Sequence, residues 1–293
     1  MKITQLEYFC MVARHRSITQ AARQLYVTQP AVSNAIRELE KEFSINLFSH
    51  NGRHLTLTRE GEIFYQKAEK LLAQIHETSA QLKDLGRFVP PVRIGIPPIL
   101  SAFFFPKLLL HFQTKYPEIP VQLFEYGSIK ASNLVAEDIL DAAIVNMNYD
   151  INKFNYYCLT REEVLFCVWP EHNLCREKKV SAESLKNEPV ILYNTDSVQN
   201  KSVNAWFASC GIQPNVILYS SQIYTIKGFV QNHLGGALLY KSMLRMHPDL
   251  TGIPLTPPIT QEIGLIWKKG KYINGSMEKF ISFIQKSSVH NSI

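Results

Sequence analysis

Apolar residues in the first forty positions recur at helical spacing in three stripes separated by polar breaks. The stripe within residues 6–13 predicts a first amphipathic helix. Ser17 and Gln20 have the spacing of a capping box, so we expect a second helix to begin there. Thr28 and Pro30 stand where a helix cap and a first-turn proline would start a third helix. The expected buried residues of the second and third helices are Ala21, Ala22, Leu25, Val32, Ala35, Ile36 and Leu39.

The short break between the second and third helices, with small residues at their crossing, predicts a helix-turn-helix. The outer face of the third helix carries amide, hydroxyl and cationic side chains, which can bond base edges or phosphates. On periodicity alone, an ordinary helical hairpin with a solvated polar face stays open as the alternative. The residues expected to contact DNA from these helices are Ser17, Thr19, Thr28, Gln29, Pro30, Ala31, Ser33, Asn34 and Arg37.

A hairpin signal follows the third helix. Residues 48–57 hold an Asn-Gly pair between two strand-like runs, which is typical of a tight β-turn. A hairpin placed after a recognition helix is a wing, whose basic side chains lie against the phosphate backbone. Arg53 and His54, with His50 beside them, are the expected contacts. The hairpin favours DNA binding over the plain helical hairpin.

Beyond Thr58 the apolar pattern changes to steps of four and three residues, which is the spacing of a coiled-coil seam. Pairing with a second copy is favoured because one winged helix reads only half of a symmetric site. A single amphipathic helix lying on its own domain is the alternative. Residues 86–91 then break the helix and start a new domain. The expected seam consists of Phe64, Ala68, Leu71, Ile75, Thr78, Leu82 and Leu85.

Strand-like and helix-like segments alternate through residues 91–293, which implies a parallel or mixed sheet covered by helices. The alternation falls into two sets, so we expect an α/β fold of two subdomains. The expected strands are 92–96, 121–124, 142–145, 164–168, 190–192, 216–218, 237–239 and 263–267. The expected helices are 104–116, 131–137, 205–210, 224–232 and 277–286.

Composition narrows the class of protein. A 293-residue chain with 46% hydrophobic residues is not largely disordered. Lys and Arg exceed Asp and Glu by 31 to 25, and residues 1–60 carry 8 basic against 5 acidic side chains, which suits a nucleic-acid-binding head. There is no leader-like start and no apolar run of ~20 residues. Five cysteines without a CxxC pair argue against a disulfide framework. We therefore expect a cytoplasmic, thiol-reduced protein without a membrane partner.

Catalytic patterns are absent from the sequence: it has no GxSxG, GxGxxG, Walker loop or HExxH. We accordingly expect no catalytic residue, no metal ligand and no cofactor. His233 is the histidine expected near a cleft, with a structural role favoured. Cys210 is expected to be buried and inert, because no second cysteine precedes it at the spacing of a redox pair.

The N-terminal motifs together resemble the LysR-type transcriptional regulators. The resemblance rests on Phe9-x-x-Val12-Ala13-Arg14, Ser17-x-Thr19-x-Ala21-Ala22, Thr28-Gln29-Pro30-Ala31-Val32-Ser33, Leu39-Glu40, Leu47-Phe48, Gly52-Arg53 and Leu57-Thr58-x-x-Gly61. It implies a homo-oligomer, dimer or tetramer, that binds double-stranded promoter DNA, contacts RNA polymerase and responds to a small-molecule effector. This sequence departs from many members at Ser44, His50 and Asn34, and further on at Asp138 and Tyr240.

The resemblance also implies a domain plan in which the effector domain is similar to periplasmic binding proteins, with two lobes around a ligand cleft. The plan assigns residues 1–58 to a winged helix-turn-helix, 59–88 to a dimerising linker helix and 91–293 to the effector domain, with lobe I at 91–161 and 268–293 and lobe II at 162–267. The rival interpretation is a solute-binding or catalytic α/β protein with an added helical domain. The missing export signal and the missing catalytic motifs disfavour it.

A ligand is expected at the carboxyl ends of the strands, against helix N-termini. The resemblance places Pro98, Ser128, Asn146, Asn194 and Thr225 at the cleft. A small carboxylate is the effector considered first, although Pro98 and Asn146 replace the hydroxyl and the cation of many carboxylate-sensing relatives. The positions at strand ends and helix starts add Ile99, Ser101, Thr195 and Tyr224 to the expected effector contacts.

Overall fold

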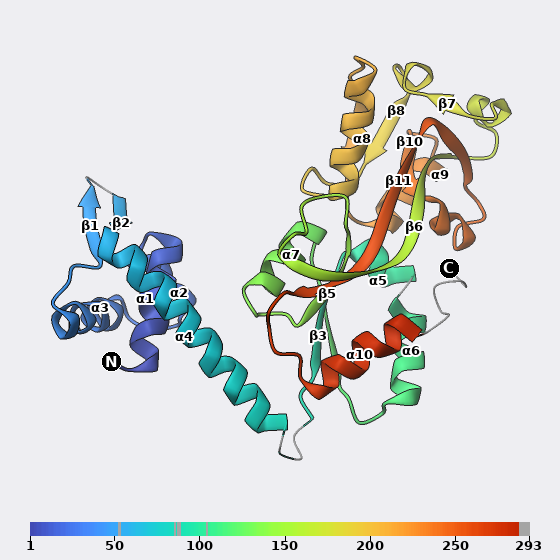
Figure 1. Cartoon of the computed structure of the whole chain (residues 1–293). Helices are drawn as coiled ribbons and strands as arrows, with labels where there is room; N and C mark the ends of the chain where they lie inside the picture. Colours follow the sequence, from blue (N-terminus) through green and yellow to red (C-terminus); the bar gives the residue numbers. More distant parts are fainter. Residues whose placement is uncertain (52–53, 85, 87–88, 104, 287–293) are drawn as a thin grey trace. The chain divides into compact units, whose positions relative to one another are not determined.

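The computed structural model describes residues 1–51, 54–84, 86, 89–103 and 105–286. Its contacts divide the chain into two compact units, Met1–Phe88 and Val89–Ile293. The first unit therefore contains both the expected head and the expected linker helix. Figure 1 shows the elements of each unit.

The N-terminal unit contains the three expected helices, a hairpin and one long helix. Its elements are α1 (Ile3–His15), α2 (Ile18–Gln24), α3 (Gln29–Phe43), β1 (Phe48–Asn51), β2 (His54–Leu57) and α4 (Arg59–Asp84). The Ser17 hydroxyl accepts a hydrogen bond from the Gln20 backbone N–H at 3.3 Å, which caps α2 as expected. Thr28 has the extended backbone of an N-cap, but its side chain makes no cap hydrogen bond. The predicted stripe of α3 is buried: Val32, Ala35, Ile36 and Leu39.

Residues of the expected coiled-coil seam lie in two different environments along the long helix α4. Phe64 and Ala68 pack into the core of their own unit, where the rings of Phe64 and Phe9 lie 5.1 Å apart. For these two residues the expected seam is wrong and the alternative of a helix lying on its own domain is right. Farther along α4, Leu82 is 62% exposed and Leu71 is also exposed. Ile63, near the start of the helix, is 56% exposed as well, so apolar side chains along α4 remain free for a partner helix.

The C-terminal unit is built on one nine-stranded mixed sheet, which confirms the expected α/β class. Its neighbouring strands follow the order β4-β3-β5-β11-β6-β10-β8-β9, and β7 pairs separately with β11. The strands are β3 (Val92–Ile96), β4 (Val121–Glu125), β5 (Ala142–Asn146), β6 (Phe154–Val168), β7 (Val180–Ser181), β8 (Pro189–Leu192), β9 (Asn215–Tyr219), β10 (Gly236–Tyr240) and β11 (Thr251–Lys268).

Helices cover this sheet, and four of the five expected ones lie close to their expected positions. The helix expected at 205–210 begins earlier, at Val198, and the helix over residues 98–103 was not expected. The helices are α5 (Pro98–Phe103), α6 (Phe105–Lys115), α7 (Ser128–Ala136), α8 (Val198–Ser209), α9 (Ile223–Gln231), α10 (Gly275–Lys286) and the short 3-10 turns η1 (Asn173–Arg176), η2 (Glu183–Leu185) and η3 (Lys241–Arg245). The ring of Phe112 on α6 lies 5.0 Å from Phe280 and 5.3 Å from Phe283, so the last helix packs against an early one. No helix in the described ranges is long and apolar enough to span a membrane.

Two long antiparallel strands, β6 and β11, run side by side through the unit (Figure 1). At one end β11 pairs with β5, with Ile263 opposite Asn146. At the other end β6 pairs with β10, with Cys167 opposite Ala237. The strand segment 263–267, expected in lobe II, thus hydrogen-bonds to a strand of lobe I.

Candidate functional site

The polar face of α3 is open to solvent, opposite its buried stripe. Ser33 is half-buried, and the Thr19 hydroxyl of α2 donates to Gln29 Oε1 at 3.4 Å. This bond brings two of the expected contact residues together at the start of α3. The exposed residues of the expected set are Thr19, Thr28, Gln29, Pro30, Ala31, Asn34 and Arg37.

The hairpin expected as a wing is present, with Phe48 opposite Leu57 and Asn51 opposite His54. His54 is the first residue of β2. Arg53 lies outside the described residues, so its expected contact stays a prediction from the sequence.

A cavity of about 180 Å³ lies in the C-terminal unit at the carboxyl ends of the parallel strands. One set of lining residues follows β3, β4 and β5, and another follows β8, so both groups of parallel strands end at the cavity. The first residues of α5, α7 and α8 also line it. The expected effector residues on its wall are Pro98, Ile99, Ser128, Asn146 and Asn194.

The other expected effector residues do not line this cavity. Ser101 lies one turn into α5, where its hydroxyl donates to the carboxylate of Glu125, a lining residue. Tyr224 is 80% exposed on α9, and Thr195 and Thr225 are also exposed. The strand-end rule also covers five further lining residues, which directly follow expected strands: Pro97, Leu100, Tyr126, Gly127 and Asp196. Sequence reasoning missed the lining residues that no strand-end position or motif pointed to. These are Glu125, Tyr193, Ser197, Val198, Gln199, Ser221 and Tyr240.

A buried polar network joins the cavity wall to the long strands. Asn146 Nδ2 donates to the Tyr240 hydroxyl at 3.1 Å and to Gln261 Oε1 at 2.7 Å. The Tyr240 hydroxyl donates to the same Gln261 oxygen at 2.7 Å. Burial raises the pKa of Tyr240, so the phenol stays protonated and can donate. The network ties the ends of β5 and β10 to β11, because Gln261 belongs to the long strand.

Two buried polar groups beside this network lack a hydrogen-bond partner among the described residues. Gln261, which is 0% exposed, has no acceptor for its Nε2. Tyr193, which lines the cavity and is 6% exposed, has no partner for its hydroxyl. Buried polar groups are normally satisfied by protein, water or ligand, so such groups next to a cavity favour a binding role.

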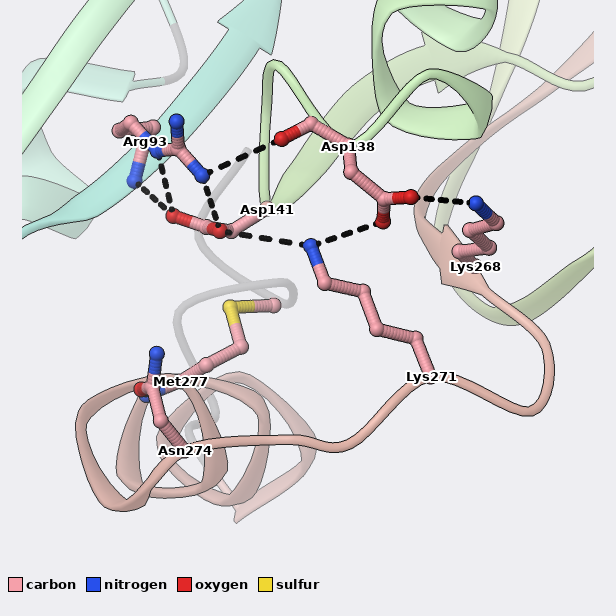
Figure 2. A network of polar contacts seen from close by, with 7 residues as sticks. All are labelled: Arg93, Asp138, Asp141, Lys268, Lys271, Asn274 and Met277. Atoms are coloured by element: carbon pink, nitrogen blue, oxygen red, sulfur yellow. Dashed lines mark hydrogen bonds and ion pairs between the residues drawn. The ribbon is translucent and has the colours of Figure 1, made fainter. Parts of the chain in front are cut away.

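A separate ion-pair network lies at the α7–β5 turn (Figure 2). Arg93 donates to Asp141 through Nη2 at 2.9 Å and through Nε at 3.1 Å. The Asp138 carboxylate forms ion pairs with the Lys268 ammonium at 2.5 Å and with the Lys271 ammonium at 3.0 Å. Asp138 also has a φ of 62°, in the left-handed region that favours glycine. The network fastens the loop after β11 to the first group of parallel strands.

His233 does not line the cavity: it precedes β10, whose far end carries the lining residue Tyr240. Its ring stacks on Trp169, with centroids 4.4 Å apart and an interplanar angle of 17°, which fits the structural role favoured from the sequence. The expected burial of Cys210 is wrong. Cys210 is exposed rather than buried, because it caps the C-terminus of α8 on the surface. Among the described residues, no three His, Cys, Asp or Glu side chains are grouped as a metal site requires.

Two family models match the chain, one for each unit. The model of the bacterial regulatory helix-turn-helix protein, lysR family, matches residues 3–62, and the LysR substrate binding domain matches residues 86–288. The chain belongs to the LysR family of transcriptional regulators. It is a DNA-binding regulator with a helix-turn-helix head and a C-terminal effector-binding domain, in a family of regulators rather than of enzymes.

Relatives of this LysR regulator match it almost end to end. An uncharacterized HTH-type transcriptional regulator, YwbI of Bacillus subtilis, is 34% identical over 94% of this chain and 92% of its own length. The Hca operon transcriptional activator HcaR of Escherichia coli is 27% identical, covering 98% of each chain. The fold is similar to that of full-length BenM, with a TM-score of 0.61 at 23% identity over 100% of this chain and 98% of that one.

Proposed function

We propose that this LysR regulator reads an interrupted dyad in promoter DNA through the exposed face of α3, and that a small molecule in the 180 Å³ cavity controls it. The proposal rests on the two sides of α3: one side is polar and exposed, and the other is a buried apolar stripe. Such a helix is anchored on one side and free to enter a major groove on the other.

The proposed contacts divide into base and backbone contacts. Gln29, Ser33 and Asn34 carry side chains that can bond base edges. Arg37 and Thr28 suit phosphates, and the Thr19–Gln29 hydrogen bond holds the amide of Gln29 at the start of the helix. Remaining members of the proposed contact set are Ser17, Pro30, Ala31, Arg53 and His54.

Assembly and response are proposed as follows. The exposed apolar residues of α4, including Leu71 and Leu82, pair two copies, and two dimers form a homotetramer on the two half-sites. Effector binding shifts the population between two arrangements of the oligomer, and the ligand acts only through its different affinity for the two. The altered DNA geometry then changes contact with RNA polymerase. A carboxylate effector has little support, because no Lys, Arg or His is among the described residues that line the cavity.

The test of base reading compares Gln29→Ala and Ser33→Ala with Gln24→Ala, an exposed glutamine on α2 outside the proposed face. Gln29→Ala and Ser33→Ala should each weaken binding to the operator by about 1–3 kcal/mol and should weaken binding to random DNA only slightly. Binding is measured by fluorescence anisotropy at fixed salt on an operator fragment selected from random duplexes. Equal losses on operator and random DNA would reduce these residues to backbone contacts, and no loss on either would remove them from the interface.

A further inference from the structure

The described residues that line the cavity include two carboxylates and no cationic side chain. Glu125, at the end of β4, and Asp196, just before α8, both line it. Among the described lining residues none is Lys, Arg or His. The two carboxylates come from opposite sides, because β4 belongs to the β4-β3-β5 group and Asp196 follows β8 of the β10-β8-β9 group.

Neither carboxylate is neutralised within the described part of the chain. Glu125 accepts a hydrogen bond from the Ser101 hydroxyl, which brings no charge, and no ion pair with a described residue involves Glu125 or Asp196. The Lys130 ammonium lies 4.8 Å from the centroid of the Tyr126 ring, on a residue that is not part of the lining. Two like charges on opposite sides of one cavity therefore face a shared space.

The side chains of Glu125 and Asp196 are exposed, so water screens their charges in part. The sign of a ligand's charge still decides whether the two carboxylates attract or repel it. An anionic ligand would meet two carboxylates and no cationic side chain of the described lining. The N-termini of α5, α7 and α8 also line the cavity, and each offers an anion only a partial positive charge. A protonated amine would instead be attracted by both carboxylates.

The unpartnered Tyr193 hydroxyl is an independent sign of a ligand at the same place. It is buried within a residue that lines the cavity, and no described residue bonds it. The cavity of about 180 Å³ admits a small molecule, whose charged end would meet the carboxylates and whose hydrogen-bonding end would meet Tyr193.

We propose that the effector of this regulator is a small organic amine, whose ammonium group lies between Glu125 and Asp196 and whose other polar group bonds Tyr193. This rests on the proposed role of the cavity as the effector site. Because the two carboxylates belong to different strand groups, the bound cation draws these groups together. Binding is thereby coupled to the arrangement of the effector domain.

The experiment uses the full chain and matched trios of compounds that share an apolar body. One trio is isopentylamine, leucine and 4-methylpentanoate, and another is phenethylamine, phenylalanine and 3-phenylpropanoate. Binding is measured by calorimetric titration near neutral pH. We expect the amine-bearing members to bind and the plain acids not to bind. The amine and amino-acid arms distinguish a pure cation from a zwitterion that also uses the α7 N-terminus.

The variants Glu125→Gln and Asp196→Asn should each weaken amine binding about tenfold or more, the effect of removing a hydrogen bond to a charged group. Glu137→Gln and Glu171→Gln, on exposed glutamates outside the lining, are the matched controls and should bind as the parent does. Tyr193→Phe should also weaken binding while leaving the melting temperature close to that of the parent. Melting curves of all variants show whether each is folded.

Binding of the plain acids alone, binding of no amine, or amine binding unchanged in both Glu125→Gln and Asp196→Asn would overturn the proposal. Operator binding by the same preparations separates this failure from failure of the proposed function. If the protein recognises its operator but binds no amine, only the proposed ligand class is refuted. Amine binding by a protein that does not recognise an operator would refute the DNA-binding proposal instead.

Discussion

Asp138 offers a test in which charge and backbone strain can be separated. Its carboxylate holds Lys268 and Lys271, and its φ of 62° is unfavourable for residues other than glycine, asparagine and aspartate (Figure 2). Asn keeps tolerance of this backbone and removes the charge. Ala removes the charge and keeps the strain. Gly removes both, so the three replacements form a graded series.

The magnitudes follow from exposure. The side chains of Asp138, Lys268 and Lys271 are 40%, 34% and 32% exposed, so each ion pair contributes only about 0.5 kcal/mol. Losing both pairs should lower the free energy of unfolding by about 1 kcal/mol in Asp138→Asn and Asp138→Gly. Asp138→Ala should lose about 1 kcal/mol more, because alanine is poorly tolerated at positive φ. Each kcal/mol corresponds to about 2–4 °C of melting temperature in a unit of this size.

Tryptophan fluorescence is the appropriate assay. All three tryptophans, Trp169, Trp206 and Trp267, lie in the Val89–Ile293 unit, so their emission follows the melting of that unit alone. High salt should reduce the difference between the parent and Asp138→Asn, because exposed pairs are screened. An Ala variant as stable as the Gly variant would refute the strain argument. An Asn variant as stable as the parent at low salt would refute the ion-pair argument.

The pH dependence of the same series has a definite sign. Burial raises the pKa of Asp138, but the Lys268 hydrogen bond and the charge of Lys271 outweigh it and leave the pKa below its ordinary value. A lowered carboxyl pKa stabilises the fold above the unfolded value, and the stabilisation is lost as pH falls through the folded value. The difference in free energy of unfolding between the parent and Asp138→Asn should therefore be largest at neutral pH and disappear in acid. A gap that widens in acid would contradict this assignment.

Three further substitutions test other features. Arg53→Ala should weaken binding almost equally on all DNA sequences and reduce the slope of log affinity against log salt by about one, and an unchanged slope removes Arg53 from the phosphate contacts. Gly61→Ala places a Cβ 2.0 Å from the Leu47 carbonyl oxygen and should destabilise the N-terminal unit by about 1–3 kcal/mol in circular-dichroism melts, whereas Gly228→Ala, with open space around it, should not. Gln261→Leu leaves Asn146 and Tyr240 without their shared acceptor and should lower stability by about 1–3 kcal/mol in fluorescence melts, and a neutral result would show that the network contributes little.

Sequence reasoning succeeded where the determining interactions are local. The buried stripe of α3 and the Ser17 cap depend on residues within one or two helical turns, and both are present. The strand-end rule likewise led to Ser128 and Asn146 at the cavity, because it needs only the position where each strand stops.

Sequence reasoning failed where a partner lies far along the chain. Phe64 fits a coiled-coil seam as well as a core, and only its contact with Phe9 decides between them. Tyr240 and Gln261 lie just outside the expected strands 237–239 and 263–267, although both belong to strands in the structure. Their shared network depends on pairing between β11 and its neighbours. The extra length of β6 was missed because its first half alternates buried and exposed residues, a weaker signal than the apolar run at its end.

The long return of β11 has a consequence for synthesis on the ribosome. β5 can pair with β11, and the Phe112 ring can pack against Phe280 and Phe283, only after nearly the whole chain has been made. About 190 residues separate β3 from Phe283, which takes roughly 10–40 s at typical rates of translation. The nascent chain must keep an unpaired sheet edge from aggregating throughout that interval. The apolar partners of the N-terminal unit all lie before residue 89, so we expect the DNA-binding head to be folded well before the domain that regulates it.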